Sequence, residues 1–337
     1  PGHGGVRLCW GARGGARLGG VVAGLLPGHH PPMMTATPSE QERTPMPGLE
    51  AFAAFAKANE PLAPYTHLKI GGPAEWLVQP RSRQELAAVV RHCTQERIPL
   101  RVLGSGCNLL VRDEGVPGVV LRLTEPAFTD VTVTPPLVRA GSGATVSALI
   151  SQAARHNLAG LESLVGIPGS VGGALRCNAG DRVNQIGQFL RRVEVLDERG
   201  DVQVRERDEL RFTDRSIQLD DPVILSAEFE LDTDDAAAIV KRMRKAWIHR
   251  KASQPLSFEA ATRVFKNPRG LHASALIEQT GLAQTRVGGA EVSERDPNYI
   301  VAHPGATARD VLRLIDLVRS RVKERFGIDL ELDLAIW

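Results

Sequence analysis

Residues 166–181, GIPGSVGGALRCNAGD, include five glycines and almost no side chain that could act as an acid, base or nucleophile. A second stretch, GSGCNLL at 104–110, has the same character. Backbone N–H groups in such loops can point together at an anion, and the missing Cβ atoms let the backbone approach a phosphate closely. Either stretch alone is also typical of a tight turn. Together they favour a phosphate-containing ligand, such as a dinucleotide, held mainly by backbone.

The two stretches do not match the G-x-G-x-x-G pattern of a Rossmann dinucleotide site. Position 109 is leucine, and the first stretch leads into a predicted strand rather than a helix. A Rossmann site is therefore disfavoured. Cys107 and Cys177 lie in these stretches, and we interpret both as small buried thiols rather than redox groups.

Helices and strands that could position the loops alternate along the first half of the chain. Ser82 and Glu85 predict a capping box for an amphipathic helix over 82–98, followed by a short buried strand at 99–104. Residues 66–80 are expected to form a strand, a Gly-Gly turn and a second strand. These patterns indicate an α/β fold.

The second half repeats this style with different sequences. A strand, a Gly-Ser-Gly turn and a helix capped at Thr145 are predicted over 137–160, and antiparallel strands over 190–232. Residues 234–255 are expected to be helical. A helix over 307–327 begins with a Thr-x-x-Asp capping box, ends at a glycine and precedes a final strand.

Composition describes an ordinary globular protein of 337 residues with 42% apolar and 24% charged residues. Its formal charge of +2 arises within residues 1–45, which we expect to be a disordered or spurious extension. The remaining charges balance, so we expect no nucleic-acid partner. We expect no membrane span either, since no window approaches 20 apolar residues. Four dispersed cysteines suggest reduced cytosol and no metal site.

Six motifs, KIGGPAEWLV, LGSGCNLLV, LVGIPGSVGGALRCNAG, LRFTDRSI, VFKNPRG and GLAQTRVGGAEVSERDPNYIV, follow one another from about residue 60 onward. In order and spacing they resemble the UDP-N-acetylenolpyruvoylglucosamine reductase family. The resemblance is to the shorter family type that lacks a tyrosine-bearing substrate loop. It implies an α/β FAD-binding fold of the vanillyl-alcohol-oxidase type with a C-terminal α/β substrate domain. The implied parts are FAD subdomains at 46–123 and 124–235 and a substrate domain at 236–337.

The resemblance also assigns roles to the glycine-rich stretches. It implies that the FAD pyrophosphate lies against the first stretch and that the second lines the cofactor along its phosphates and toward the flavin. Gly106 and Gly172 are expected to be positions where a side chain would obstruct the cofactor. The implied cofactor-binding residues are Gly104, Ser105, Gly106, Cys107, Asn108, Leu109, Gly169, Ser170, Gly172 and Gly173.

The family reaction transfers a hydride from NADPH through FAD to the enolpyruvyl double bond of a UDP-linked amino sugar. Negative charge then develops beside a carboxylate, so the site needs a nearby cation and a proton donor. By resemblance Arg215 is the stabilising cation, and Lys266 and Asn267 bind the substrate. A cytoplasmic monomer with FAD as cofactor and NADPH as co-substrate is expected.

Two catalytic positions depart from the family. Arg263 stands where the family has a serine or cysteine proton donor, and Asp333 stands at the family glutamate position. Asp296 and Pro297 also replace the usual histidine and alanine. Arginine does not ordinarily donate a proton at neutral pH, which leaves Thr262, Ser257 or water as donors. Two functions therefore stay open: an active reductase, or a flavin- or nucleotide-sugar-binding relative with lost or altered catalysis.

Overall fold

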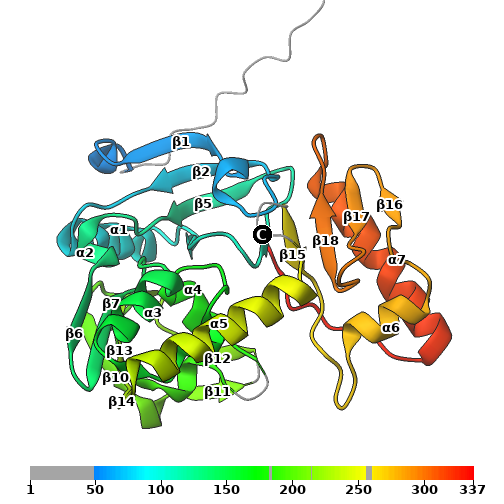
Figure 1. Cartoon of the computed structure of the whole chain (residues 1–337). Coiled ribbons are helices and arrows are strands. Elements are labelled where there is room, and N and C mark those ends of the chain that lie inside the picture. Colours follow the sequence, from blue (N-terminus) through cyan, green and yellow to red (C-terminus); the bar gives the residue numbers. More distant parts are fainter. Residues whose placement is uncertain (1–48, 182–183, 214, 256–259) are drawn as a thin grey trace, which may run out of the picture. The chain divides into compact units, whose positions relative to one another are not determined.

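The computed structural model describes residues 49–181, 184–213, 215–255 and 260–337 (Figure 1). The described residues belong to one compact unit, 47–337. The expectation for residues 1–45 lies outside the described residues. All elements below belong to this compact unit, which carries both glycine-rich stretches.

The first part of this unit is a four-stranded sheet with strand order β1-β2-β5-β3. Strands β2, β5 and β3 are parallel, and β1 pairs antiparallel with β2 at the edge. Helix α1 begins where Ser82 Oγ accepts a hydrogen bond from Glu85 N at 3.1 Å, and its predicted apolar face is buried. The elements are η1 (Leu49–Phe52), β1 (Ala56–Pro61), η2 (Ala63–Tyr65), β2 (Pro73–Val78), α1 (Arg83–Gln95), β3 (Leu100–Val102), β4 (Leu109–Leu110) and β5 (Val116–Leu121).

The strand expected before the Gly-Gly turn is wrong, because the partner of β2 is β1, which lies earlier in the chain. Residues 66–72 form turns instead, with Thr66 Oγ1 donating to Ile70 O at 3.0 Å and Lys69 at a φ of 58°. Leu68 and Ile70 are buried in the apolar core of the C-terminal part. Tertiary packing therefore overrides the local sequence pattern that predicted a strand before the Gly-Gly turn.

The second part is a five-stranded antiparallel sheet with strand order β10-β9-β13-β7-β6. Alternate residues of its inner face pack with helices α3 and α4 into one apolar core, and Thr145 caps α3 as predicted. The glycine-rich residues 166–170 connect η3 to α4, and Gly172 and Gly173 lie in the first turn of α4. The elements are α2 (Pro126–Thr129), β6 (Val131–Thr134), β7 (Leu137–Gly141), α3 (Val146–Arg155), β8 (Leu158–Ala159), η3 (Leu161–Leu164), α4 (Val171–Arg176), η4 (Ile186–Gln188), β9 (Leu190–Leu196), β10 (Val202–Glu206), η5 (Arg207–Glu209), β11 (Arg211–Thr213), β12 (Ser216–Gln218), β13 (Val223–Glu230) and β14 (Asp232–Thr233).

Helix α5 (Ala236–Ser253) packs along the second part rather than the C-terminal sheet. Arg242 pairs with Glu162 at 2.7 Å. Arg250 donates to the carbonyl oxygens of Ser163 and Val165 at 2.9 and 3.0 Å. The domain boundary expected between residues 235 and 236 would therefore separate α5 from residues 162–165 of the second part, which α5 contacts.

The C-terminal part is a four-stranded antiparallel sheet, order β15-β18-β17-β16, covered by two helices. Helix α7 begins with the predicted capping box of Thr307 and Asp310 and ends at Gly327, whose φ is 70°. Its predicted apolar stripe is buried. The elements are β15 (Ala261–Arg263), α6 (Ala273–Gln279), β16 (Arg286–Val287), β17 (Ala290–Val292), β18 (Tyr299–Ala302), α7 (Ala308–Phe326) and β19 (Ala335–Ile336).

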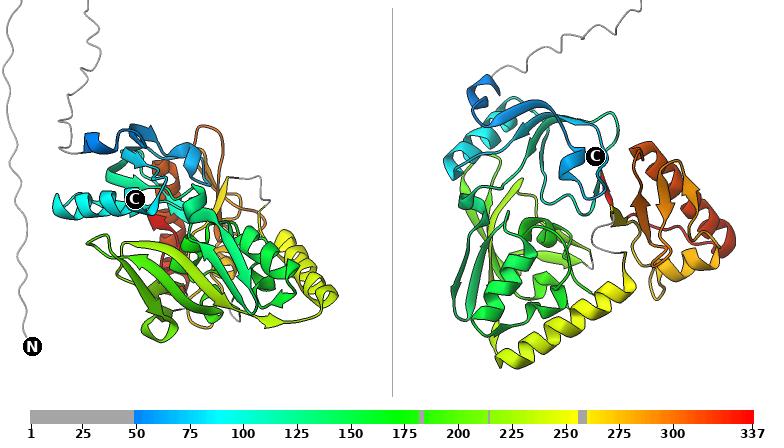
Figure 2. Two further views of the ribbon diagram at one scale, coloured as in Figure 1. Left: turned by 90° about the vertical axis from the view of Figure 1, so that its left-hand side faces the viewer. Right: turned by 45° about the horizontal axis from the view of Figure 1, so that its top comes forward.

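The last residues return from the C-terminal sheet to the first glycine-rich stretch, as the red segment shows in Figures 1 and 2. β19 pairs in parallel with β4, and Trp337 N donates to Leu110 O at 2.9 Å. Asp113 adds a second connection, because its carboxylate accepts hydrogen bonds from the first backbone N–H groups of α7. The chain end therefore crosses directly beside the first glycine-rich stretch.

Candidate active site

The two glycine-rich stretches lie against each other. A Cβ built at Gly104 would collide with Ser170 Oγ, so the first stretch approaches the second within backbone distance. Val146 N donates to Gly169 O at 3.0 Å and Gly172 N donates to Ser142 O at 2.8 Å, which fixes the second stretch to the start of α3. The structure thus brings together the two loops that the sequence singled out.

The glycines differ in what surrounds them. A Cβ at Gly106 would lie 2.5 Å from Tyr65 O, and one at Gly172 would lie 2.9 Å from Ser142 Cβ. Both glycines are therefore required by packing within the chain itself. In contrast, a Cβ at Gly169 meets no described atom within 4 Å, and one at Gly173 meets only the Ser170 hydroxyl, at 3.2 Å. Open space lies in front of Gly169 and Gly173.

The other loop residues have mixed surroundings. Ser105 is exposed, whereas Leu109 is buried in the core of the first part. Ser170 is buried and its Oγ accepts a hydrogen bond from Gly173 N at 3.3 Å, so this side chain caps α4. Asn108 Nδ2 donates to Asp333 O at 2.8 Å and also lies 3.6 Å from Cys177 Sγ. Its amide therefore faces the chain end.

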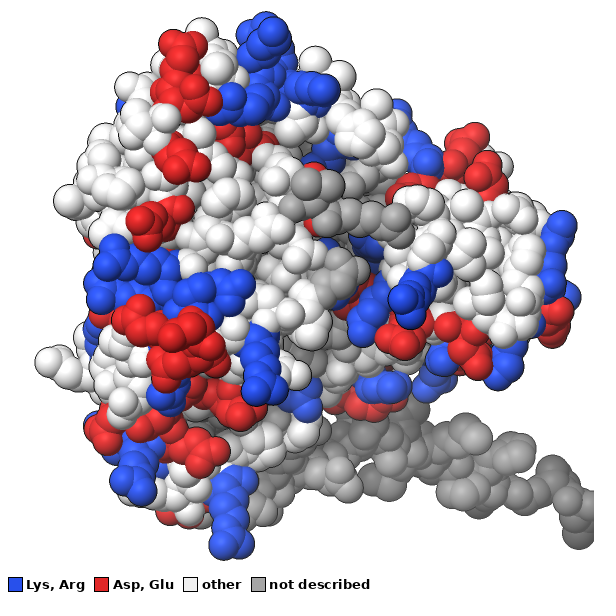
Figure 3. All heavy atoms as spheres, turned by 90° about the horizontal axis from the view of Figure 1, so that it is seen from below, with Lys and Arg blue, Asp and Glu red and all other residues white. Residues whose placement is uncertain are grey.

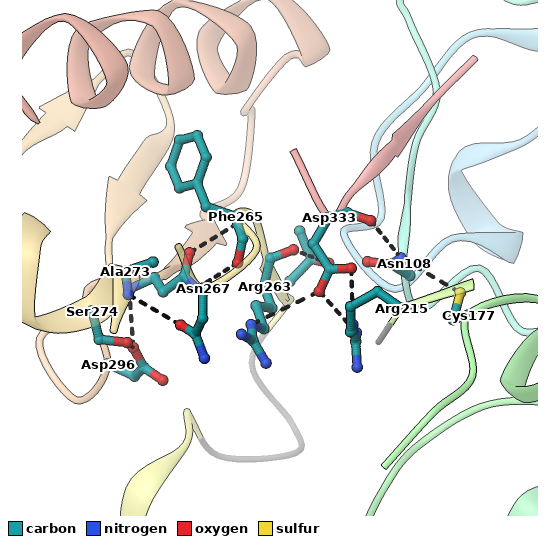
Figure 4. A network of polar contacts seen from close by, with 12 residues as sticks. Asn108, Cys177, Arg215, Arg263, Phe265, Asn267, Ala273, Ser274, Asp296 and Asp333 are labelled. Atoms are coloured by element: carbon teal, nitrogen blue, oxygen red, sulfur yellow. Dashed lines mark hydrogen bonds and ion pairs between the residues drawn. The ribbon is translucent and has the colours of Figure 1, made fainter. Parts of the chain in front are cut away.

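Asp333 lies between two arginines (Figure 4). Its carboxylate accepts a hydrogen bond from Arg215 Nε at 3.0 Å, and its Oδ2 lies 2.8 Å from Arg215 Nη2. Arg263 Nε is 3.9 Å from the same oxygen. The Asp333 side chain is only 3% exposed, against 20% for Arg215 and 30% for Arg263. We call these three residues the arginine–aspartate cluster.

Backbone pairing sets the position of Asp333. Its N–H donates to Val264 O at 2.8 Å, next to Arg263, and its own carbonyl accepts from Asn108. Residue 333 is thus held on one side by the exit of β15 and on the other by the first glycine-rich stretch. The cluster forms because three distant segments cross at this point.

Arg215 lies at the turn of the β11–β12 hairpin, which pairs Thr213 with Ser216. Asn178, only 1% exposed, donates from Nδ2 to Thr213 O at 2.7 Å, and its Oδ1 accepts from Gly187 N at 3.2 Å. This amide ties the hairpin to the end of the second glycine-rich stretch. The sequence did not predict that Asn178 positions the hairpin, because one asparagine in a glycine-rich run is typical of a turn.

Lys266 and Asn267 make contacts within the chain. Lys266 Nζ lies 3.3 Å from Glu331 Oε2 in an exposed pair. Asn267 Oδ1 accepts a hydrogen bond from Ala273 N at 3.0 Å and so caps the start of α6. Asp296, one of the departures from the family pattern, accepts from Ser274 Oγ and from Asn298 N. These residues shape the loops beside β15.

Burial keeps both thiols near the loops protonated. It raises the pKa of Cys107 to about 11, with Cys177 nearby adding to the effect, and it also raises the pKa of Cys177. Among the described residues, no group of three or more His, Cys, Asp and Glu could hold a metal ion. No described helix is long and apolar enough to cross a bilayer. On the face in Figure 3, basic and acidic side chains lie interspersed.

Comparison with known proteins shows which protein family this chain belongs to. Residues 254–337 match the C-terminal domain of UDP-N-acetylenolpyruvoylglucosamine reductase, and residues 74–205 match an FAD binding domain. The reductase 2 of Symbiobacterium thermophilum is 44% identical over 280 residues, covering 82% of this chain and 91% of that protein. The chain belongs to the UDP-N-acetylenolpyruvoylglucosamine reductase family.

Other members extend the likeness. The reductase of Rhodopirellula baltica is 35% identical over 304 residues, covering 90% of this chain and 99% of that protein. The crystal structure of the reductase from Thermus caldophilus matches with a TM-score of 0.72 and 37% identity, covering 84% of this chain and 98% of that one. The expected fold class, an α/β FAD-binding fold of the vanillyl-alcohol-oxidase type with a C-terminal α/β domain, is confirmed.

The two family matches bracket helix α5. The FAD binding match includes both glycine-rich stretches and ends at 205, and the reductase match begins at 254, directly after α5 ends at Ser253. Arg263 and Asp333 of the arginine–aspartate cluster lie within the reductase match, whereas Arg215 lies between the two matches.

Proposed function

We propose that this chain catalyses the NADPH-dependent reduction, through FAD, of UDP-N-acetylglucosamine enolpyruvate to UDP-N-acetylmuramate in peptidoglycan precursor synthesis. One observation carries the proposal: a member of this family holds a nearly buried carboxylate between two guanidinium groups beside its paired glycine-rich loops. Two guanidinium groups and one carboxylate leave one net positive charge. That charge suits a reaction in which an anion develops next to a substrate carboxylate.

FAD, when bound, supplies the hydride chemistry that side chains lack, linking NADPH to the carbon–carbon double bond. The chain fits such a group because open space faces Gly169 and Gly173. We assign the pyrophosphate to the backbone of 104–109 and the remaining length of the cofactor to Gly169, Ser170, Gly172 and Gly173. We expect the cofactor to be held without a covalent bond, since neither loop contains a histidine and the raised pKa values of Cys107 and Cys177 keep their thiols protonated.

Arg215 stabilises the negative charge that develops on the substrate. Asp333 Oδ1 accepts a hydrogen bond from Nε of Arg215, and Oδ2 lies 2.8 Å from Nη2 in an ion pair, so the carboxylate holds the guanidinium at its side. Because the partner is a carboxylate that is 3% exposed, water does not compete for this contact. Asp333 thus orients Arg215 before the reaction begins, and Arg263 adds a second cation from β15.

The substrate's UDP-linked sugar binds along the loop after β15. We assign this contact to Lys266, whose side chain is 44% exposed and is held only by a surface pair, and to Asn267. A surface pair contributes little to stability, about 0–1 kcal/mol, so Lys266 can exchange Glu331 for a phosphate at small cost. The loop is rigid at Asn267, which caps α6.

Several finer features belong to the same proposal. The chain is of the shorter family type without the tyrosine-bearing loop, and it acts as a cytoplasmic monomer. The organisation keeps FAD subdomains from 46 and 124, but the contacts of Arg242 and Arg250 support placing α5 with the second subdomain. The substrate domain then begins near 254 rather than at 236.

A second candidate function is a flavin- or nucleotide-sugar-binding relative with lost or altered catalysis. The departures at Arg263 and Asp333 favour it. Aspartate reaches one methylene less far than glutamate, and a misplacement of about 1 Å can cost on the order of a hundredfold in rate. The pairing of Asp333 with Arg215 favours the active enzyme.

Purified protein tests the proposal directly. We expect yellow protein that releases FAD on denaturation, consumes NADPH only when the enolpyruvyl sugar is present, and forms a product heavier than the substrate by two hydrogen atoms in mass spectrometry. Yellow protein without that product would favour the second candidate. Colourless protein that does not bind added FAD would exclude the reductase and any flavin-binding relative.

A further inference from the structure

The reaction needs a proton at the substrate carbon beside the carboxylate, and the structure narrows its source. Arg263 keeps its protons at neutral pH. Thr262 is buried, and its hydroxyl proton is engaged, since Oγ1 donates to Cys107 O at 3.0 Å. Ser257 lies outside the described residues. Besides Ser257 and water, the donors to consider are the side chains that face Arg263.

Tyr299 faces Arg263 across a strand pair. In the register of β15 and β18, Arg263 is directly opposite Tyr299. Directly opposed residues of an antiparallel pair have Cβ atoms roughly 4.5–5.5 Å apart and project from the same face of the sheet. Ile300, the next residue, projects to the other face and is buried in the C-terminal core. Tyr299 thus projects to the face that carries Arg263.

The position of Tyr299 is fixed by its neighbour Asn298, which is 2% exposed. Asn298 Nδ2 donates to Phe265 O at 2.8 Å, and its Oδ1 accepts from Phe265 N at 2.9 Å. Val264 N donates to Asn298 O at 2.9 Å. These contacts prevent β18 from slipping along β15 and keep the phenol opposite the guanidinium.

The surroundings suit a phenol that gives up a proton and takes it back. Burial raises the pKa of Tyr299, so the phenol is protonated at neutral pH. Arg263 is the strongest of the charges that act against this rise. Arg250 and Arg215 act in the same sense, and Asp296 acts with burial. Arg263, which is directly opposite in the strand register, is therefore placed to stabilise a phenolate, and Arg250 and Arg215 favour the phenolate in the same sense.

We propose that Tyr299 is the general acid of this enzyme and that Arg263, at the family's proton-donor position, stabilises the phenolate that remains. The proposal rests on the proposed function. In the protonation step the electron pair of the substrate enolate forms a new C–H bond with the phenol proton, and the phenol O–H bond breaks. The O–H electron pair stays on the phenolate oxygen, and water restores the proton after product leaves.

The first test measures the two half-reactions separately by anaerobic stopped-flow. Tyr299→Phe keeps the ring and removes the proton, so we expect flavin reoxidation by substrate to slow at least about 100-fold, while reduction by NADPH stays within about twofold. The chain has one other tyrosine, Tyr65, whose hydroxyl donates to Glu60 at 2.6 Å. Tyr65→Phe is the matched control and should leave both rates unchanged.

Unchanged reoxidation in Tyr299→Phe would overturn the proposal, and so would an equal loss in both half-reactions. If the unaltered protein reduces flavin with NADPH but never passes hydride to the enolpyruvyl sugar, the proposed function itself fails. The two failures are therefore distinguishable.

The second test does not depend on turnover. In the Tyr65→Phe protein, 3-fluorotyrosine labels Tyr299 alone and lowers its titration range, and ¹⁹F NMR then follows ionisation of that single phenol. We expect Arg263→Gln to move this titration to higher pH, because a facing cation is lost. We also expect the alkaline fall in reoxidation rate to move to lower pH with fluorination. No movement in either measurement would contradict the proposal.

Discussion

The glycine-rich loops and the arginine–aspartate cluster lie beside each other but use opposite means. The loops present backbone, and two of their glycines, Gly169 and Gly173, face open space. The cluster presents charged side chains from three segments, arranged around one carboxylate that is 3% exposed. The difference supports the proposed division of tasks, in which the loops hold the cofactor and the cluster stabilises charge on the substrate.

The largest effect is expected in the cluster. Arg215→Ala removes the better-placed cation and leaves Asp333 with only the 3.9 Å contact to Arg263. We expect flavin reoxidation by substrate to slow by on the order of 10²–10³-fold, the range for losing one stabilising group of a developing anion. Reduction by NADPH should remain nearly intact.

Stopped-flow measurement of both half-reactions checks this prediction. The control is Arg321→Ala, which breaks an exposed pair with Glu324 and should change stability by less than about 1 kcal/mol. Equal losses in both half-reactions of Arg215→Ala would instead place Arg215 in folding or flavin placement, and the comparison between loops and cluster would fail.

Two adjacent glycines of α4, Gly172 and Gly173, test the proposed role of the glycine-rich loops in holding the cofactor. Gly173→Ala replaces a helical glycine and brings its methyl group to 3.2 Å from the Ser170 hydroxyl, so the stability of the protein without cofactor should change by less than about 1 kcal/mol. FAD affinity should fall about tenfold, or 1.4 kcal/mol, because the methyl occupies space assigned to the cofactor.

Gly172→Ala is the matched variant, because its methyl group would press on Ser142 Cβ. It should lower the unfolding temperature of the protein without cofactor. Thermal unfolding and fluorescence titration with FAD distinguish the two variants. Equal FAD affinity in Gly173→Ala and the unaltered protein would remove the second loop from the cofactor site.

A smaller effect is expected when the family serine is restored. Arg263→Ser supplies a hydroxyl but removes the guanidinium that faces Tyr299 and Asp333. We expect no gain in flavin reoxidation by substrate. A gain on the order of tenfold, about 1.4 kcal/mol of barrier, would show that the natural residue impairs the enzyme.

The smallest effect concerns the thiols in the loops. Since burial raises the pKa of Cys107 to about 11 and also raises that of Cys177, the reactive thiolate is scarce below that range. Alkylation by iodoacetamide at pH 8 should be slow and should rise with pH, as mass spectrometry of the folded protein can show. Rapid alkylation at pH 8 would contradict the interpretation of both as inert buried thiols.

Local signals in the sequence predicted much of the fold. Capping residues such as Ser82, Thr145 and Thr307 lie at the helix starts that they predicted, because a cap depends on neighbours within one turn. The strand expected before the Gly-Gly turn at 71–72 failed because Leu68 and Ile70 pack into a core formed mostly by residues 264–334. A local pattern does not carry that information.

The candidate active site likewise combines residues that the sequence predicted with contacts that depend on tertiary structure. The family resemblance identified Arg215, Arg263 and Asp333 as single positions. It did not predict that Asp333 pairs with Arg215, 118 residues away, because that contact forms only where the end of the chain passes beside the β11–β12 hairpin. Asn178 and Asn298 give no sequence signal, since each acts through hydrogen bonds to distant backbone. Which glycines face open space also depends on what packs against them, which spacing does not reveal.

One anaerobic stopped-flow experiment tests the central claim, that the loops and the cluster together form a working reductase. NADPH is mixed with the FAD-loaded protein, and the enolpyruvyl UDP-sugar is added in a second mixing step. The account predicts bleaching of the flavin by NADPH and a return of its absorbance when the sugar arrives. A flavin that bleaches but stays bleached in the presence of the sugar would contradict it.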